Sequence, residues 1–270
     1  MQWLELTSDA MREAVQTAGG LCLLPMGCLE RHGPHLPVGT DQIAADLVSL
    51  AAAETEPAVV FPSYYLGVIF TAKHQLGTIA LTRQLLLPVL EATIDEIARN
   101  GFKKILIVNS HGGNCRLLHL FLRMLLEEAR DYVVYTTDYY VLEEGPRQHW
   151  HQMRDSDFGG HADEMETSVM LHLRPDLVHM EALTRPDEGR PMGRLRHLPD
   201  LNTSISWHAD HPTHYAGDAR AATAEKGEFL FKACVEKLVK QMRAIKSDSV
   251  SQELQAEFYR KAAHPDRADQ

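Results

Sequence analysis

Four short apolar runs set the strongest constraint on the fold of this chain of 270 residues. They cover residues 20–26, 58–62, 104–109 and 132–136, and each is nearly continuous. Runs of this kind are typical of parallel strands that are covered on both faces. Helical patterns separate the runs, and this alternation predicts an α/β domain with a mainly parallel sheet.

The helical patterns cover residues 41–53, 82–100, 116–131 and 219–243. We expect the second to be regular only from Pro88, because proline suits the first position of a helix. This helix should end at Asn100-Gly101, a common helix stop. The third pattern has large apolar residues at helical spacing, which indicates a packed face rather than a ligand pocket.

We expect a single domain over residues 1–247 and a polar tail over residues 248–270. Within the domain, residues 143–157 and 185–218 are rich in Pro, Gly, Asp and His and are predicted to form long loops. Long loops inside a compact domain are usually functional or mobile. The sequence does not decide whether these two act as lids over a site.

The composition excludes several classes of protein. The net charge of −10 argues against a nucleic-acid-binding protein, which would normally present a basic face. No apolar run approaches the roughly 20 residues that cross a bilayer, and the first residues lack the pattern of a signal peptide. The four cysteines are scattered, which suits a reducing cytoplasm. We therefore expect a cytoplasmic protein without a membrane partner, and we interpret Cys28 and Cys115 as small buried apolar residues.

The segment CLERHGPHLPVGTD, residues 28–41, follows directly on the first apolar run. It therefore emerges at the carboxyl edge of the predicted sheet, where open α/β sheets bind their ligands. In extended chain, residues two apart face the same way, so Glu30 and His32 can converge on one point. Asp41 stands where a helix begins and could simply be its N-cap. That account explains neither Glu30 nor His32.

Two further motifs place polar side chains near the ends of elements. NSHGGN, residues 109–114, puts His111 at the same sheet edge, and its glycines allow a sharp turn and the close approach of a ligand. HADEMETS, residues 161–168, opens a helix, and acids in a first helical turn are favoured by the helix dipole. Glu166 lies deeper, next to apolar residues, so a carboxylate buried there would need a partner.

These motifs together offer a shell for two divalent metal ions: the carboxylates Glu30, Asp41 and Glu166 and the imidazoles His32 and His111. The two ions bring four positive charges and the carboxylates bring three negative ones, so one bridging hydroxide would neutralise the site. Bound metals generate such a nucleophile at neutral pH. The mixture of oxygen and imidazole suits zinc or manganese, with iron as a third choice, and it contains no thiolate that would require zinc.

The segments PMGCLERHGPHLPVGTD, NSHGGN and HADEMETS resemble those of the creatininase (creatinine amidohydrolase) family, in its HGGN-type form. The resemblance extends to Leu76-Gly77-Thr78-Ile79 and to GDARAATAEKG at residues 217–227. It implies a three-layer α/β/α fold with a two-metal site, often in a homo-oligomer that is a hexamer built as a trimer of dimers. The family hydrolyses C–N bonds, usually amides in small cyclic compounds.

Carried over to this chain, the resemblance implies that Glu30, Asp41 and His111 hold one metal ion. His32 and Glu166 then hold the other, and Asp41 bridges the two. Creatinine-hydrolysing members carry Tyr-Glu where this chain has two glycines, and that Glu is a metal ligand in them. Here Glu166 takes over its role, as in the HGGN-type members.

The resemblance also makes His161 the acid and base that handles the proton of the substrate, which fits its place at the start of a helix. Glu164 either orients His161 or faces solvent, and we expect solvent. We assign substrate binding to His74, Gly112, Gly113 and Trp150. Trp150 could equally well belong to a lid over the site or pack in the interior. For His74 and the loop histidines at 208, 211 and 214, a solvated or structural role is the simpler account.

The sequence therefore predicts a dinuclear metal-dependent hydrolase that cleaves a C–N amide bond of a small cyclic or formamide-type molecule by a metal-bridging hydroxide. HGGN-type members act on formamides of ring-opened purines, on peptide termini and on cyclic sugar-derived ketones. One alternative is therefore hydrolysis of a C–C or ester bond in an inosose-type ketone or a lactone. Another is a non-catalytic protein that binds a metal or ligand, although such a protein should have lost at least one of the expected ligands or His161.

Overall fold

The sheet has the predicted parallel architecture. A computed structural model of the chain describes residues 1–185 and 187–265. Its strands are β1 (Leu21–Met26), β2 (Val59–Val60), β3 (Lys104–Asn109) and β4 (Val133–Asp138). They pair in the order β2-β1-β3-β4, and every neighbouring pair is parallel. The run at 58–62 yields only two paired residues, and the run at 132–136 extends to Asp138.

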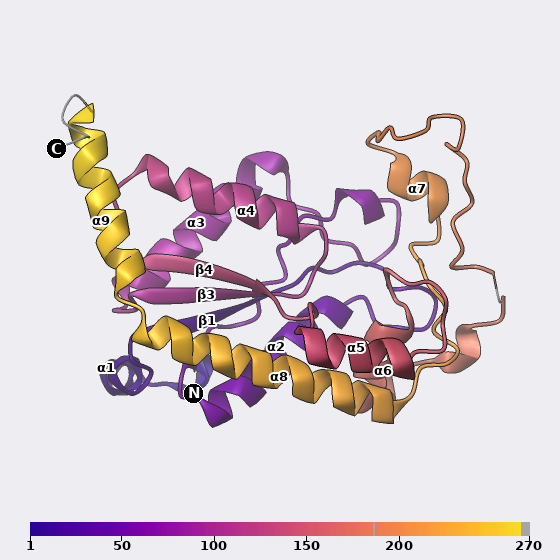
Figure 1. Cartoon of the computed structure of the whole chain (residues 1–270), viewed down its shortest axis with the longest axis horizontal. Coiled ribbons are helices and arrows are strands. Elements are labelled where there is room, and N and C mark those ends of the chain that lie inside the picture. Colours follow the sequence, from indigo (N-terminus) through magenta and orange to yellow (C-terminus); the bar gives the residue numbers. More distant parts are fainter. Residues whose placement is uncertain (186, 266–270) are drawn as a thin grey trace.

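Helices cover both faces of this sheet (Figure 1). They are α1 (Ser8–Thr17), α2 (Thr40–Thr55), α3 (Arg83–Arg99), α4 (Asn114–Met124), α5 (Glu144–Met153), α6 (Glu164–Leu173), α7 (Ser206–Asp210), α8 (Ala224–Ser247) and α9 (Val250–Ala263). Short 3-10 helices lie at Trp3–Glu5, Phe70–Ala72, Leu125–Glu127, Pro175–Leu177 and Met180–Ala182. Helices α3 and α4 lie on one face and α2 and α8 on the other, which confirms the predicted three-layer fold.

Strand alternation divides the interior into two apolar cores. On β1, Leu21 and Leu23 join the core beneath α2 and α8, whereas Leu24 and Met26 join the core beneath α3 and α4. Successive side chains of a strand point to opposite faces, so a strand covered on both sides must be apolar throughout. All six residues of β1 are buried, which explains why this strand reads as a continuous apolar run.

Two predictions about regular structure were wrong. Helix α3 begins at Arg83 rather than at Pro88, because burial of Leu86 and Leu90 on either side of the proline outweighs the one backbone hydrogen bond that proline cannot donate. The segment at 143–157 is not a loop but contains α5, whose Trp150 is buried. The segment at 185–218 is mostly irregular, as predicted, apart from the short helix α7 and residue 186, which lies outside the described residues.

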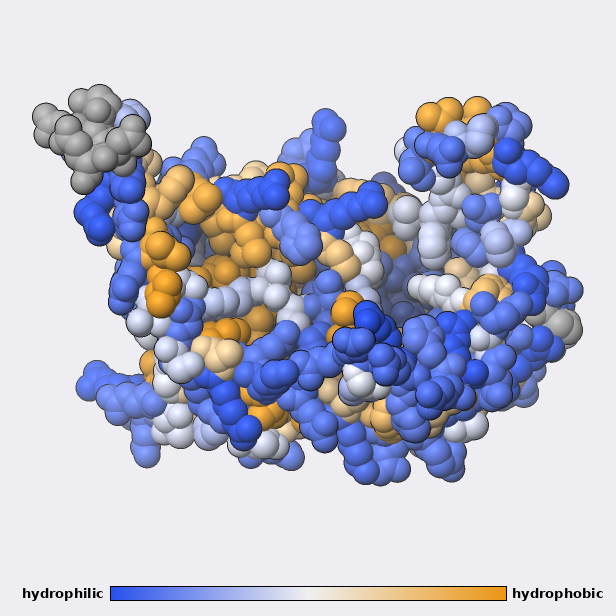
Figure 2. Space-filling view, viewed as in Figure 1, coloured by the Kyte–Doolittle hydropathy of each residue, from blue (hydrophilic) through white to orange (hydrophobic). Residues whose placement is uncertain are grey.

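The polar tail predicted from residue 248 contains α9, and its residues 266–270 lie outside the described residues. Helix α9 projects from the body of the molecule, and apolar side chains gather between it and α4 (Figures 1 and 2). The exposed apolar residues of this surface are Leu120, Met124, Val250, Leu254 and Phe258. None of the helices in the described residues is both long and apolar enough to cross a membrane.

Helices α6 and α8 pack closely where Gly227 of α8 faces Ser168 of α6. A Cβ atom at position 227 would lie 1.8 Å from the Ser168 carbonyl oxygen and 2.9 Å from the Cβ of His172. No side chain fits this gap, so a glycine is required for the two helices to approach. The crossing matters for function because α6 carries Glu166 at its first turn.

We expect Gly227→Ala to lower the free energy of unfolding by about 3 kcal/mol, because the added methyl group must push the two helices apart. Urea unfolding followed by circular dichroism measures this change. Gly145→Ala on α5 is a matched control, since nothing lies within 4 Å of a Cβ at that position. It should change the stability by less than about 1 kcal/mol. Equal effects of the two substitutions would contradict the packing argument.

Candidate metal centre

Three chain segments meet at the carboxyl edge of the sheet. Met26 of β1 pairs with Asn109 of β3, so the segments that follow these two strands start side by side. The third segment leads into α6, and the backbone of His161 exchanges two hydrogen bonds with Ala216, at 2.9 and 3.0 Å. The His161 imidazole then donates a hydrogen bond from Nε2 to the Arg31 carbonyl oxygen, at 2.8 Å, which ties the third segment to the first.

Asp41 lies at the centre of this meeting point. Its Oδ1 is 3.0 Å from Nε2 of His32, and its Oδ2 is 3.0 Å from Nδ1 of His111. The N-cap of α2 is Gly39, so Asp41 lies inside the first turn and does not serve as the cap that its sequence position allowed. A carboxylate whose two oxygens face two different imidazoles is suited to bridge two cations.

The histidines of the site are fixed by backbone carbonyl groups. A carbonyl oxygen only accepts hydrogen bonds, so the ring nitrogen beside it must carry a proton, and the opposite nitrogen is the one that can bind either a second proton or a metal ion. In all three cases that second nitrogen faces the cluster. The bonds are His32 Nδ1 to the Glu30 oxygen (3.1 Å), His111 Nε2 to the Val68 oxygen (3.0 Å) and His161 Nε2 to the Arg31 oxygen (2.8 Å). This is the arrangement that metal-binding histidines normally have.

The charges of the cluster favour a cation. Burial alone would lower the pKa of His32, but the Asp41 carboxylate outweighs burial and raises it to about 10. Burial would likewise raise the pKa of Glu30 and of Asp41, but the neighbouring histidines hold both below their ordinary values. Buried carboxylates thus draw positive charge to this point, which protons on the imidazoles supply when no metal does.

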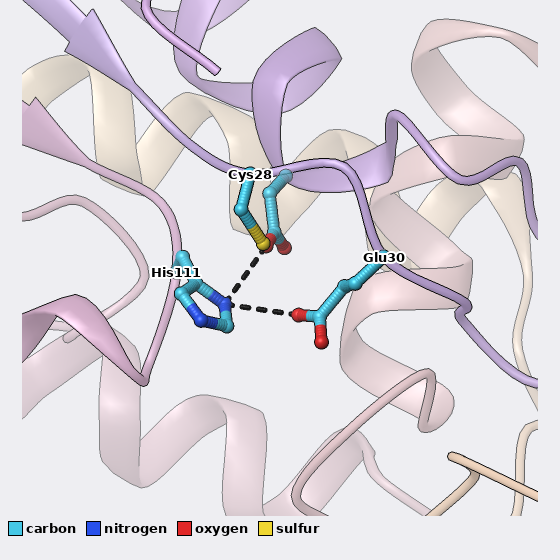
Figure 3. Close-up of side chains that lie close together, drawn as sticks. Cys28, Glu30 and His111 are labelled. Atoms are coloured by element: carbon cyan, nitrogen blue, oxygen red, sulfur yellow. Dashed lines mark hydrogen bonds and ion pairs between the residues drawn. The ribbon is translucent and has the colours of Figure 1, made fainter. Parts of the chain in front are cut away.

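The donor atoms also fit metal ions in number and spacing. One group consists of Cys28, Glu30, Asp41 and His111, and a second of His32, Asp41 and Glu166; within each group, all potential ligand atoms lie within 4.8 Å of one another. Oε1 of Glu30 is buried and accepts no hydrogen bond, although it lies only 2.9 Å from Nδ1 of His111. Figure 3 shows the side chains of Cys28, Glu30 and His111 pointing toward one another. A cation at this point would satisfy this oxygen.

His161 lies beside these groups, with its ring centroid 4.3 Å from that of His32. Burial, reinforced by the charge of His32, lowers the pKa of His161 to about 3, so its imidazole is neutral. The next residue, Ala162, has the left-handed backbone angle φ of 55°, which costs a non-glycine residue on the order of 1–3 kcal/mol. Its N–H donates to Oε2 of Glu166 at 2.6 Å, and this bond helps to hold the strained turn.

Glu164 does not face solvent as the sequence suggested, nor does it contact His161. It is buried, and its carboxylate lies 2.5 Å from the ammonium group of Lys226 on α8. The backbone N–H of Ser156 donates to the same carboxylate at 2.7 Å. Burial alone would raise the pKa of Glu164, but the Lys226 charge lowers it. The acid therefore anchors α6 to α8, and its sequence position in a polar first turn gave no sign of the distant lysine.

The structure brings in two residues, His214 and Trp207, to which the sequence assigned no role in the metal site. His214 accepts a hydrogen bond at Nδ1 from the indole N–H of Trp207, at 3.0 Å. Its Nε2 must then carry the proton, and it donates to Oε2 of Glu30 at 2.7 Å. His214 is buried and has a φ of 55°. A cluster of histidines in an irregular loop was the only sequence signal, and it did not separate His214 from the half-buried His208 and His211.

A cavity of about 590 Å³ opens onto the cluster. Gly112 and Gly113 line it, as do Glu30, Asp41, His111, His161 and Glu166. A Cβ at Gly113 would lie 2.4 Å from Nε2 of His111, so glycine is needed for the bond between His111 and Val68. His74 and Trp150 do not line the cavity: His74 contacts the Pro212 oxygen at 3.0 Å, and Trp150 packs in the core beneath α2 and α8.

Comparison with known proteins assigns the chain to a family. The family model described as creatinine amidohydrolase, Creatininase, matches residues 4–242. The chain therefore belongs to the creatininase family and is a hydrolase. It is 28% identical to a creatinine amidohydrolase of Pseudomonas putida, over 88% of this chain and 95% of that protein. It is 30% identical to a mycofactocin precursor peptide peptidase of Mycobacterium ulcerans, over 80% and 82%.

A more distant relative has a different kind of name. The 3-dehydro-scyllo-inosose hydrolase of Thermotoga maritima is 25% identical, over 89% of this chain and 82% of that protein. Among solved structures, a mutant creatininase described as Zn-Zn type superimposes with a TM-score of 0.75 and 26% identity, covering 92% of this chain and 98% of the other. A structure described as creatininase Mn gives a TM-score of 0.75 and 25% identity, covering 92% of this chain and 99% of the other.

We expect Asp41→Asn to lose metal from both positions, because one carboxylate faces both groups of ligands. Mass spectrometry of the metal-loaded, desalted protein should give about two ions per wild-type chain and almost none in the variant. Glu166→Gln should lose at most one ion. Glu54→Gln is the control: it removes an exposed charge from α2, the helix that carries Asp41, and should retain the wild-type metal content. Full metal content in Asp41→Asn would contradict the bridging arrangement.

His214→Asn should weaken metal binding by about 10- to 100-fold, because the carboxylate that His214 orients would lose its donor. Asparagine tolerates the left-handed backbone at this position, but its shorter side chain does not reach Glu30. A chelator competition titration measures the affinity. His208→Asn on α7 is the control and should bind metal like the wild type. An unchanged affinity in His214→Asn would show that Glu30 needs no orienting partner.

Proposed function

We propose that the protein is a dinuclear metal-dependent hydrolase that cleaves a C–N amide bond of a small cyclic or formamide-type substrate. The observation that carries this proposal is the orientation of His32 and His111. Each donates to a backbone carbonyl group and presents its other nitrogen to one oxygen of Asp41. Family membership and the amide-cleaving relatives support the reaction class.

In this proposal, Glu30, Asp41 and His111 hold one ion, and His32, Asp41 and Glu166 hold the other. Zinc is the first choice and manganese or iron the alternatives, since oxygen and imidazole donors suit all three. Such ions supply Lewis acidity toward a carbonyl oxygen and activate water at neutral pH. Side chains of the protein must then bind the substrate and move its proton.

His161 is the residue that we propose to move the proton. Its Nε2 is occupied by the Arg31 carbonyl oxygen, so its Nδ1, 3.9 Å from Oε1 of Glu30, is the nitrogen that faces the reaction. A neutral imidazole with a bare Nδ1 accepts a proton from the attacking water and then delivers it to the leaving nitrogen. The hydrogen bond to Arg31 holds the ring in place during both transfers.

The cavity favours an uncharged substrate with an apolar body. Its wall includes Val68, Phe70, Met165, Val169, Trp207 and Leu230. Within the described part of the chain, no lysine or arginine lines the cavity, so a phosphate or carboxylate remote from the metals would find no cationic partner. Gly112 presents an open backbone there, since the nearest atom to a Cβ at that position is 3.9 Å away.

A second reaction remains an alternative because of the inosose hydrolase relative. Cleavage of a C–C or ester bond would use the same metal groups and differ in the leaving group, which would be a carbon or an alcohol oxygen instead of a nitrogen. The apolar residues of the wall favour a less polar ring, although Thr71 and Tyr140 also line the cavity and could bind hydroxyl groups. A protein that only binds the metals and a ligand would need neither His161 nor its bare nitrogen.

A panel of substrates tests the proposal: creatinine, formamidopyrimidines, cyclic amides, lactones and inosose-type ketones, each with metal-loaded enzyme. We expect turnover of an amide. His161→Ala should lower kcat by about 10²- to 10⁴-fold, the usual contribution of a general acid or base, while the metal content stays unchanged. His151→Ala, an exposed histidine of α5, should have the wild-type rate.

Other outcomes of the panel would redirect the proposal. Turnover of lactones or ketones alone would replace the amide with the alternative reaction. Metal binding without turnover of any compound would favour the non-catalytic protein.

The hexamer that the family resemblance implies stays a prediction. The exposed apolar side chains on α4 and α9, including Met124 and Phe258, are the described surface that supports association of copies of this chain. Burial of such a surface would lower the free energy of an oligomer by about 25 cal/mol per Å² of apolar area.

A further inference from the structure

Cys28 lies within the metal-ligand cluster, although its place in the sequence suggested an ordinary apolar residue. Its side chain is fully buried, and its Sγ is 3.2 Å from Oδ2 of Asp41. That oxygen is the one that faces His111, so the sulfur belongs to the first group of ligands and not to the second. In Figure 3 the sulfur points to the same spot as the carboxylate of Glu30 and the imidazole of His111.

The neighbours of Cys28 can be compared with those of Cys22 on β1, a buried cysteine six residues earlier in the chain. The Sγ of Cys22 lies in an apolar core and contacts the Leu23 carbonyl oxygen at 3.7 Å. A thiol that merely fills space behind Asp41 would account for the contact with that carboxylate. It would not account for Oε1 of Glu30, which is buried in the same four-residue group and accepts no hydrogen bond. Four donor atoms around one point indicate a cation at that point.

We propose that Cys28 is the fourth protein ligand of the ion held by Glu30, Asp41 and His111, and that its thiolate makes this position selective for zinc over manganese. The inference rests on the proposed metal centre and deepens it. On binding, the thiol releases its proton to solvent, and the sulfur forms the bond to the ion. Sulfur is a soft donor that suits zinc, cobalt or iron, whereas manganese prefers oxygen.

The charge balance supports the thiolate. The carboxylates of Glu30, Asp41 and Glu166 carry three negative charges, and a Cys28 thiolate adds a fourth. Two divalent ions carry four positive charges, so the cluster becomes neutral with protein ligands alone. A neutral assembly is the one that a fully buried position tolerates best, because net charge is costly to bury.

The test uses the full chain, stripped of metal and reloaded with Co²⁺. A thiolate ligand gives an intense sulfur-to-cobalt charge-transfer band in the near ultraviolet, separate from the weaker visible bands of the ion. We expect this band in the wild-type protein and its loss in Cys28→Ser, with the visible bands retained. Cys115→Ser is the matched control, because Cys115 contacts Tyr140 at 3.0 Å instead of the cluster, and it should keep the band.

A competition between Zn²⁺ and Mn²⁺ gives a second readout. Cys28→Ala should lower the preference for zinc by at least about tenfold, since the soft donor is gone. This variant also replaces Cys28→Ser if the serine protein fails to fold. Two bound cobalt ions without the near-ultraviolet band, or a band that survives in Cys28→Ser, would overturn the thiolate ligand. Failure of the wild-type chain to bind any metal would instead overturn the proposed function on which this inference rests.

Discussion

The contact of the Asp41 carboxylate with two imidazoles is the interaction on which the rest of the site depends. A carboxylate this deeply buried is stable only beside positive charge, and His32 and His111 bring that charge from two different loops. The parallel pairing of β1 and β3 places those loops next to each other. The position of the acid on α2 therefore sets where the proposed metal ions and the proposed proton-transfer group His161 would lie.

Successive layers of hydrogen bonds hold this arrangement. Backbone carbonyl groups fix which nitrogen of each histidine faces inward, so rigid main chain sets the chemistry of the site. His214 and Trp207 extend the support of Glu30 out to α7, in the irregular segment above the cavity. Lys226 and Glu164 join α8 to α6 below it. A movement of α7 would therefore change the orientation of Glu30, a proposed metal ligand, because Trp207 of α7 bonds to His214 and His214 bonds to Glu30.

The two parts of the cavity have different functions in the proposed reaction. The floor concentrates carboxylates and imidazoles, which are the donors that would hold the proposed metal ions. The wall is largely apolar, and in the described part of the chain it contains no lysine or arginine for a charged substrate group. Relatives named for different substrates share the family. Cys28, which is fully buried and does not line the cavity, would tune the metal instead.

The sequence by itself determined the layers, the parallel sheet and the three motifs, because strands covered on both faces must be apolar and loops at strand ends carry the polar groups. Periodicity also located α2, α3, α4 and α8, but it missed α5 and misjudged Pro88, where tertiary burial overrides a local preference. Only the tertiary structure decided what each polar side chain contacts. Glu164 meets a lysine 62 residues away and His214 meets a carboxylate 184 residues away, and no local pattern encodes such pairs. For the same reason Cys28 was interpreted as an ordinary apolar residue, because the potential metal ligands around it come from three separate segments of the chain.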